Sequence, residues 1–444
     1  MFIKIAQLFL SLTILVTLHE FGHFWFARRF KCRVDKFYLF FDFLFPFSGV
    51  LNFPLFKKKI GDTEYGLGWF PFGGYVQIAG MMDEQMDKSL IDKEPEPWEL
   101  RAKPAWQRLL VMLGGILVNV IVGILIFWMS LFAWGKETLP MANVKTGLMV
   151  DSNAYKIGLR NGDFITSLDR MPVKSINRVA VEIIMNGIDT IEGVHANGEK
   201  FSLRVTDDDR SRILKALKHS EFIRPRYVAT IDSVPAGTSA SRAQIKKGDV
   251  FLAINGTPVK YFDEFRQQLM ANKNNIVPIK ILRGKDTVNT RCYINGNGVM
   301  GVVTTFLELP AKTDKQEFGF FEALVQGVKD GKEMLVMQAK QIVVLITVKD
   351  AHQQVSGFYT MVQQMHETWD WQRFWVFTAF LSLALAFMNF LPIPMLDGGY
   401  IMFILWEMVT GKKVSDKIIY YANNVGLIIV LSLMIYANTD WLRQ

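Results

Sequence analysis

Apolar runs that alternate with charged segments set the organisation of this chain. Runs of membrane-crossing character extend over about 2–27, 109–134, 374–388 and 418–436, and the first exceeds the roughly 20 residues that a bilayer core requires. Five basic residues lie within 28–36, directly after the first run, which places its carboxyl end in the cytoplasm and its amino end outside. The pattern predicts an α-helical membrane protein with four transmembrane helices.

The segment between the second and third runs, 135–310, is mixed polar and apolar and contains an internal repeat. Residues 151–165 are echoed by residues 232–256, and each copy carries a Gly-Asp pair that we expect to serve a turn between strands. Two soluble modules are therefore predicted. A charged linker with a short helix is expected at 207–226, and an amphipathic helical segment at 318–365.

Composition supports this mixed organisation. Of the 444 residues, 50% are hydrophobic and 21% are charged, and the mean hydropathy is +0.18, so the chain is too apolar for an average soluble protein yet needs sizeable aqueous parts. The formal net charge of +8 is modest, and we expect no nucleic-acid function. Cys32 and Cys292 fall on opposite sides of the membrane in this scheme, so no disulfide is expected. The first run lacks a small-residue cleavage site and is expected to be a retained span.

The first apolar run contains His19-Glu20-Phe21-Gly22-His23, an H-E-x-x-H motif. Residues four apart lie on one face of a helix, so His19 and His23 can direct imidazole nitrogens at one metal ion, as in zinc sites. Glu20 is not needed as a ligand, and its carboxylate can take a proton from water at the metal and pass it to a leaving group. Alternatively, the three side chains merely satisfy one another, but burying them at the end of an apolar run is costly without a partner. The motif predicts a metal site.

Zinc needs a third protein ligand, and Asp397 is the candidate. It ends the stretch Asn389-Phe-Leu-Pro-Ile-Pro-Met-Leu-Asp397, in which Pro392 and Pro394 prevent the helix of the third run from continuing normally. Unwound backbone at membrane depth is tolerated only where it is buried in protein or lines a cavity, so this acid is a functional candidate. The alternative is a plain turn at the end of a span. Counting roughly 1.5 Å per helical residue places the H-E-x-x-H motif and Asp397 at comparable depths.

Two further segments have expected roles near this site. Residues 66–80 contain apolar strand formers around Gly73-Gly74, a turn signal, and predict a β-hairpin; the alternative is an ordinary surface hairpin. A strand edge there could pair with a peptide as it unwinds. The second span contains Gly115 and Asn119, for which we expect supporting or structural roles and not ligation, because small residues permit close helix packing and an Asn can hydrogen-bond a neighbour.

The H-E-F-G-H motif, the G-G-Y-V motif and the late N-F-L-P-I-P-M-L-D-G-G motif together resemble the site-2 protease family of intramembrane zinc metalloproteases. The resemblance covers nearly the whole chain. It implies that Zn²⁺ is bound by His19, His23 and Asp397, and that Glu20 is the catalytic base. It also implies substrate-binding residues, which are Asn389, Gly73, Gly74, Tyr75 and Val76. The positions expected to support the site are Asn119, Gly115, Pro392 and Pro394.

The two soluble modules resemble bacterial PDZ domains, whose groove takes an extended peptide by strand addition. The implied fold has four transmembrane helices, a membrane-associated β-hairpin and two extracytoplasmic α+β PDZ domains. Its parts are 1–134, 135–222, 223–310 and 311–444. The resemblance also implies partners, namely the lipid bilayer, peptides at the PDZ domains and single-span membrane protein substrates such as anti-sigma factors, with remnant signal peptides as further substrates. It implies a multi-pass protein of the bacterial inner membrane with its PDZ domains in the periplasm.

Two other functions fit parts of the sequence. A membrane scaffold or chaperone could hold peptides through the modules and carry a vestigial metal site. A zinc transporter is less compatible, because the polar groups within the spans cluster at one depth and form no path across the membrane. Enzyme and scaffold differ in one observation, which is whether Glu20 matters to any activity.

Overall fold

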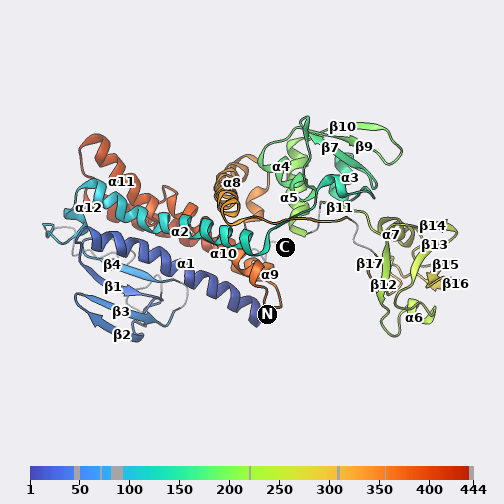
Figure 1. The fold of residues 1–444 in the computed structure, drawn as a ribbon, viewed down its shortest axis with the longest axis horizontal. Helices are drawn as coiled ribbons and strands as arrows, with labels where there is room; N and C mark the ends of the chain where they lie inside the picture. Colours follow the sequence, from blue (N-terminus) through green and yellow to red (C-terminus); the bar gives the residue numbers. More distant parts are fainter. Residues whose placement is uncertain are drawn as a thin grey trace. The chain divides into compact units, whose positions relative to one another are not determined.

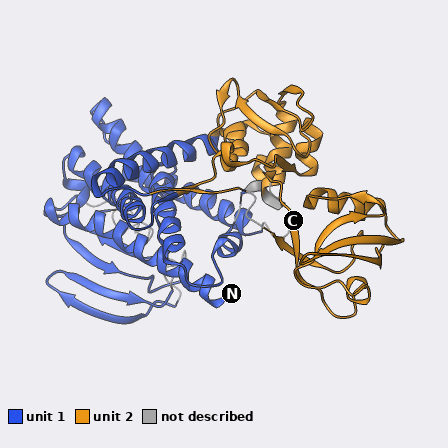
Figure 2. Ribbon diagram, turned by 45° about the vertical axis from the view of Figure 1, so that its right-hand side comes forward, with its two compact units in different colours: residues 1–136, 317–342, 355–444 blue, residues 137–316, 343–354 orange. Residues whose placement is uncertain are grey.

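In the structure, a computed structural model, the chain forms two compact units (Figure 2). Unit 1 comprises residues 1–136, 317–342 and 355–444, and unit 2 comprises residues 137–316 and 343–354. Residues 71 and 72 of the predicted hairpin lie outside the described residues. The described ranges are 1–44, 51–70, 73–81, 94–219, 222–307, 311–355 and 357–439.

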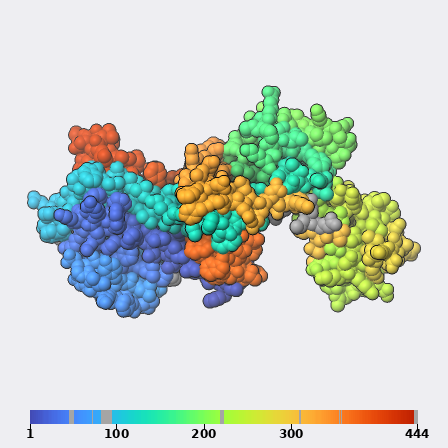
Figure 3. All heavy atoms as spheres, in the orientation of Figure 1, coloured from blue at the N-terminus to red at the C-terminus, as the bar shows by residue number. Residues whose placement is uncertain are grey.

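Among the described residues of unit 1, four helices are long and apolar enough to cross a membrane, and each overlaps a predicted span. The prediction of four spans is therefore confirmed. Helix α1 packs against α2 and α10, and α11 packs against α2. Helices from the N-terminal and C-terminal parts of the chain therefore lie in one bundle (Figures 1 and 3). The helices of this bundle are α1 (Phe2–Arg29), α2 (Ala105–Trp134), α10 (Trp371–Phe390), α11 (Asp397–Thr410) and α12 (Asp416–Asn438).

Small residues bring the helices of unit 1 into close contact. A Cβ added at Gly22 of α1 would lie 2.3 Å from the carbonyl oxygen of Gly114 in α2, so the two backbones touch there. The amphipathic helix α8 (Phe320–Thr347) approaches α2 in the same way, because a Cβ at Gly327 would lie 2.9 Å from the backbone nitrogen of Trp128. The predicted helical segment at 318–365 is completed by α9 (Phe358–Gln364).

A four-stranded sheet in unit 1 has the strand order β2-β3-β1-β4. Strands β2 and β3 form a hairpin whose turn contains Gly61 at φ +60°, whereas β4 pairs antiparallel with β1. Strand β1 also pairs in parallel with β3 and so separates β3 from β4. The predicted hairpin about Gly73-Gly74 is therefore wrong. The strands are β1 (Val34–Tyr38), β2 (Pro54–Ile60), β3 (Thr63–Gly68) and β4 (Tyr75–Ile78).

The glycines of this sheet serve close packing instead of a tight turn. A two-residue primed turn needs positive φ angles, and neither Gly73 nor Gly74 has one. A Cβ at Gly73 would lie 2.6 Å from the ring of Phe41, and a Cβ at Gly74 would lie 2.6 Å from the carbonyl oxygen of Tyr38. The Gly-Gly pair thus lets the chain pass close beside β1. The sequence pattern alone does not distinguish glycines that allow close packing from glycines that form a tight turn.

The part of unit 2 up to residue 225 forms a first α+β module around its own apolar core. Its sheet has the order β10-β9-β7-β8, and β11 pairs with β6. Residues 343–354, which follow in the chain after both modules, add Val344 and Ala351 to this core. The elements are β5 (Lys136–Thr138), β6 (Leu148–Val150), α3 (Ser152–Ile157), β7 (Phe164–Leu168), β8 (Met171–Pro172), α4 (Val179–Met185), β9 (Thr190–Val194), β10 (Lys200–Arg204), α5 (Asp207–His219) and β11 (Ile223–Pro225).

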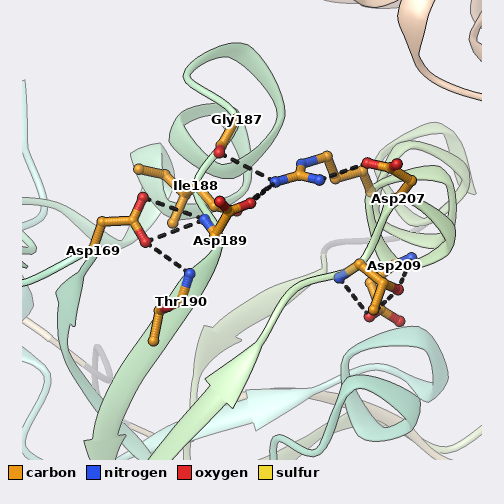
Figure 4. A network of polar contacts seen from close by, with 9 residues as sticks. Asp169, Gly187, Ile188, Asp189, Thr190, Asp207 and Asp209 are labelled. Atoms are coloured by element: carbon orange, nitrogen blue, oxygen red, sulfur yellow. Dashed lines mark hydrogen bonds and ion pairs between the residues drawn. The ribbon is translucent and has the colours of Figure 1, made fainter.

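The short helix predicted within 207–226 is present as α5, but it packs into the first module, so its predicted place in a linker is wrong. Its apolar side contributes Ile213 and Ala216 to the module's buried core. Arg210 of α5 donates to the carboxylate of Asp189 at 2.6 Å. The carboxylate of Asp169 accepts the backbone N–H of the next residue, Thr190 (Figure 4). The charged sequence of α5 conceals this packing, because only one narrow stripe of the helix is apolar.

The second module has a separate core and a larger sheet, of order β16-β15-β13-β12-β17, with β14 paired to β13. In both modules the Asp of the repeated Gly-Asp pair is buried and accepts the backbone N–H three residues earlier, from Arg160 to Asp163 and from Lys246 to Asp249. This shared bonding supports the internal repeat. The elements are β12 (Ala229–Ser233), α6 (Ser239–Arg242), β13 (Val250–Ile254), β14 (Thr257–Pro258), α7 (Phe262–Ala271), β15 (Ile276–Arg283), β16 (Asp286–Tyr293) and β17 (Val303–Phe306). Strand β18 (Asp314–Gln316) pairs with β5 in a separate two-stranded sheet.

Candidate metal centre

Helix α1 brings the two histidines of the H-E-x-x-H motif together on the face that packs inside unit 1. His19 is 6% exposed and His23 is 3% exposed, and their Nε2 atoms lie 3.2 Å apart. The spacing of four residues and the regular helix produce this pairing, as the sequence predicts.

Asp397 completes the cluster from the opposite end of the chain. Helix α10 ends at Phe390, the backbone is not helical over 391–396, and α11 begins at Asp397. The Oδ2 atom of Asp397 lies 3.3 Å from Nε2 of His19 and 3.3 Å from Nε2 of His23. Within the described ranges, these three side chains form the one group of three or more His, Cys, Asp or Glu whose ligand atoms converge in this way.

The geometry of the three atoms fits zinc. They form a nearly equilateral triangle with edges of 3.2, 3.3 and 3.3 Å. Ligand atoms of a tetrahedral zinc site lie about 3.3 Å apart when the zinc–ligand distances are about 2.0–2.1 Å. Asp397 Oδ2 is also buried without a hydrogen-bond partner among the described residues, so a cation would satisfy it.

Helix α2 sets the chemical state of both imidazoles. The Nδ1 atom of His23 lies 2.8 Å from the carbonyl oxygen of Val111, which can only accept, so Nδ1 carries the proton and Nε2 presents its lone pair. The carboxamide of Asn119 lies 3.3 Å from Nδ1 of His19, and its Oδ1 is otherwise without a partner in the described structure. Turning that amide by 180° places Oδ1 as the acceptor of the His19 Nδ1–H. Both Nε2 atoms would then present lone pairs to a metal ion.

Gly115 makes the room that the two rings occupy. A Cβ at this position would lie 2.5 Å from Cε1 of His19 and 2.5 Å from Nε2 of His23. Such distances are too short for carbon and nitrogen atoms in contact, so a side chain here would displace the imidazoles. Both Gly115 and Asn119 therefore lie against the ligand pair, at the positions expected for supporting residues.

Glu20 lies beside this cluster and is held by the neighbouring sheet. Its Oε2 atom accepts the backbone N–H of Val76 at 3.0 Å. Val76 belongs to β4, the last strand in the order of this sheet, and its N–H is used by Glu20. Tyr75, the residue before it, donates its hydroxyl to Asp42 at 3.0 Å and is buried. The sheet edge and the carboxylate of Glu20 are thus in direct contact.

A cavity of about 620 Å³ opens onto these groups. Asn389, near the end of α10, lines it and places its amide nitrogen 3.1 Å from Nε2 of His19. The other predicted site residues that line the cavity are His19, Glu20, His23, Gly73, Gly74, Tyr75, Val76 and Asp397. Pro392 and Pro394 instead lie in the nonhelical stretch that carries Asp397.

Several cavity-lining residues were not assigned to the site from the sequence, among them Phe358, Tyr400 and Asn423. Phe358 lies at the start of α9, Tyr400 lies in α11, and Asn423 lies in α12. Asn423 could have been singled out, because an amide within an apolar span needs a hydrogen-bond partner. The sequence does not tell which partner.

Comparison with known proteins identifies the family to which the chain belongs. The model of peptidase family M50 matches residues 7–433. The chain belongs to peptidase family M50. Members of this family depend on zinc, so the predicted cofactor, enzyme class and family are confirmed.

Relatives in this M50 family match along nearly their whole length. "Putative zinc metalloprotease" of Xylella fastidiosa (strain Temecula1 / ATCC 700964) is 25% identical, with 97% of this chain and 96% of the relative covered. "Regulator of sigma-E protease RseP" of Salmonella typhimurium (strain 14028s / SGSC 2262) is 26% identical over the same shares, 97% and 96%. "Protease RseP" of Yersinia pestis is 24% identical, again with 97% and 96% covered. The chain is thus a membrane-embedded zinc metalloprotease of this family.

Proposed function

We propose that this M50 protease is an endopeptidase that cleaves transmembrane segments of single-span membrane proteins. The observation that carries the proposal is the position of the triad. His19 and His23 lie in a helix of membrane-spanning length, and Asp397 follows the end of another. His19 and His23 are buried within the bundle and Asp397 is half-buried beside them, where a water-soluble peptide has little access.

The residues of the site divide the chemical work. His19, His23 and Asp397 would hold zinc, which when bound acts as a Lewis acid and lowers the pKa of water. Glu20 takes a proton from the attacking water and gives it to the amine that leaves. Asn389, whose amide reaches the ligand triangle, can donate a hydrogen bond to the carbonyl of the scissile peptide.

The edge of β4 offers a way to hold an unwound substrate. A transmembrane helix hides its peptide groups in its own hydrogen bonds, so it must open locally before hydrolysis. An opened segment could pair by strand addition with β4, the last strand in the described order of this sheet, beside Glu20. The expected contacts of Gly73, Gly74, Tyr75 and Val76 with substrate fit this arrangement, because all four line the cavity.

The relatives and the soluble modules extend the proposal to a cellular setting. Relatives bear the name regulator of sigma-E protease, and by analogy the substrates are anti-sigma factors cleaved in regulated intramembrane proteolysis, with remnant signal peptides as further substrates. The protein would lie in the bacterial inner membrane. The two α+β modules would be periplasmic PDZ domains that filter substrates by size and admit those already trimmed outside.

Replacement of Glu20 by Gln tests the enzymatic proposal. The parent and Glu20→Gln are purified in detergent and incubated with a model single-span substrate, and the products are located by mass spectrometry. We expect cleavage inside the transmembrane segment by the parent, none by the variant, and equal zinc content in both. Retained cleavage in Glu20→Gln would overturn the role of Glu20. If the parent and the variant bind the model substrate equally and neither cleaves it, a scaffold is favoured.

A separate variant tests the size filter. Removal of residues 135–310 leaves the spans with the metal cluster, and we expect this variant to cleave untrimmed substrates that the parent excludes. If both proteins exclude untrimmed substrates equally, the modules do not act as a filter.

A further inference from the structure

The fourth span, α12, contacts the segment that presents Asp397. Within α12 the buried residues are Asn423 and Gly426, which lie on one face one turn apart. The window of this helix that could span a membrane is only 11% buried, so α12 is otherwise loosely covered. Its buried contacts are therefore concentrated where it meets residues 391–396.

The segment before Asp397 has a conformation that needs support. Met395, two residues before Asp397, has φ +83°, a region that a side chain with a Cβ rarely adopts. Such conformations persist where surrounding contacts hold them. Pro392 and Pro394 lack N–H groups and cannot contribute backbone donors of their own.

Asn423 supplies a contact at this strained residue. Its Oδ1 accepts the backbone N–H of Met395 at 3.2 Å, and its Nδ2 donates to the hydroxyl of Tyr400 at 2.8 Å. Asn423 is 2% exposed, so water does not compete freely for these bonds. A Cβ at Gly426 would lie 2.0 Å from the carbonyl oxygen of Pro394, which shows how closely α12 approaches the same segment.

We infer that Asn423 is a positioning residue of the metal centre, because it fixes both sides of Asp397. Through Met395 it holds the backbone two residues before the carboxylate, and through Tyr400 it holds α11 three residues after it. The Oδ2 atom of Asp397 then stays 3.3 Å from both imidazoles. The fourth span thereby contributes to zinc binding without supplying a ligand. The inference rests on the proposed metal centre and extends it to α12.

Substitution of Asn423 by Leu removes both hydrogen bonds and keeps a side chain of similar size that an apolar span accepts. The matched control is Asn424→Leu, since Asn424 bonds only to the backbone of its own helix, at Tyr420, among the bonds described for it. Zinc affinity of the purified full-length proteins is measured by competition with a chelator, and kcat and KM are measured on the model single-span substrate.

We expect Asn423→Leu to lose roughly 10- to 100-fold in zinc affinity, which is usual when a group that orients metal ligands is removed. Its kcat should fall at limiting zinc and rise toward that of the parent when zinc is added. Asn424→Leu should match the parent in all three quantities. Zinc affinity in Asn423→Leu equal to that of the parent would overturn the positioning role.

Two further outcomes keep the test decisive. If Asn423→Leu does not fold, Tyr400→Phe replaces it, because this variant keeps the bond between Asn423 and Met395 but removes the hydroxyl that accepts from Asn423 Nδ2. A loss of zinc affinity in Tyr400→Phe supports the role, and an unchanged affinity contradicts it. A parent protein without zinc and without cleavage would instead refute the proposed function itself.

Discussion

The replacement Gly115→Ala tests how tightly the second span fits the metal centre. The added Cβ would lie 2.5 Å from atoms of both His19 and His23, whereas ordinary contacts begin at 3.4 Å, so the rings or the helices must shift by about 1 Å. Overpacking of this kind costs about 1–3 kcal/mol of stability, and a 1 Å misplacement of reacting groups costs roughly 100-fold in rate. The change from Gly to Ala favours α2 itself by about 0.5–1 kcal/mol, so any loss comes from packing.

The matched control is Gly123→Ala, on the same helix. There the new Cβ would lie 2.8 Å from both Cγ and Cδ2 of the buried Leu383, so this variant is overpacked as well, but no metal ligand is among its nearest atoms. Zinc per chain, kcat/KM and thermal unfolding are measured for both variants. We expect Gly115→Ala to lose zinc and at least about 100-fold in kcat/KM, whereas Gly123→Ala should lose thermal stability from overpacking and keep its zinc. One zinc per chain and full activity in Gly115→Ala would refute the packing argument.

Three further predictions concern separate sites. Burial alone would raise the pKa of Asp249, but the guanidinium of Arg283, at 2.7 and 2.8 Å, holds that pKa below its usual value. The resulting stability is present above the ordinary pKa of about 3.9 and lost as pH falls through the lowered value, so Asp249→Asn should lower the melting temperature at pH 7 and differ less from the parent near pH 3. Burial raises the pKa of the Cys292 thiol to about 11, so in a Cys32→Ala background maleimide should label folded protein slowly at pH 7 and unfolded protein fast; fast labelling of the folded form would contradict this. Asn389→Leu should keep zinc and lose roughly 100- to 1,000-fold in kcat, and unchanged kcat would exclude its role at the carbonyl.

The metal cluster was predictable because helix geometry and membrane depth are simple functions of sequence. The i, i+4 spacing of His19 and His23 determines a shared face, and counting residues from each span end places Asp397 at a similar depth. The structure brings these three side chains within 3.3 Å. Four apolar runs likewise became four helices, with ends that moved by a few residues.

The sheet and the fourth span were harder to predict because their contacts are not local. Gly73 and Gly74 were interpreted as a turn, but they make room for Phe41 and for the backbone at Tyr38. The pairing of β4 with β1 instead of β3 depends on residues far apart in the sequence. Asn423 carried a signal as a buried amide, yet its partners Met395 and Tyr400 became visible only in the folded chain.

Helix α5 shows a third limit, which is composition. Its first turn contains Asp207, Asp208 and Asp209, and this acidic run is typical of exposed connections. The same helix buries Ile213 and Ala216, which are three residues apart and therefore share a face. A narrow apolar face of a charged helix is thus missed when a segment is interpreted from its charge and not from the helical spacing of its apolar residues.

The most direct test of the metal centre is the zinc environment of the purified protein, measured by metal analysis and X-ray absorption in the parent and in Asp397→Ala. We expect about one zinc per chain in the parent, bound by two imidazole nitrogens and by oxygen at about 2.0–2.2 Å. We expect Asp397→Ala to bind zinc weakly and to leave the model substrate uncleaved. A parent that cleaves without zinc, or whose zinc has sulfur or a single imidazole in its coordination shell, would contradict the centre formed by His19, His23 and Asp397.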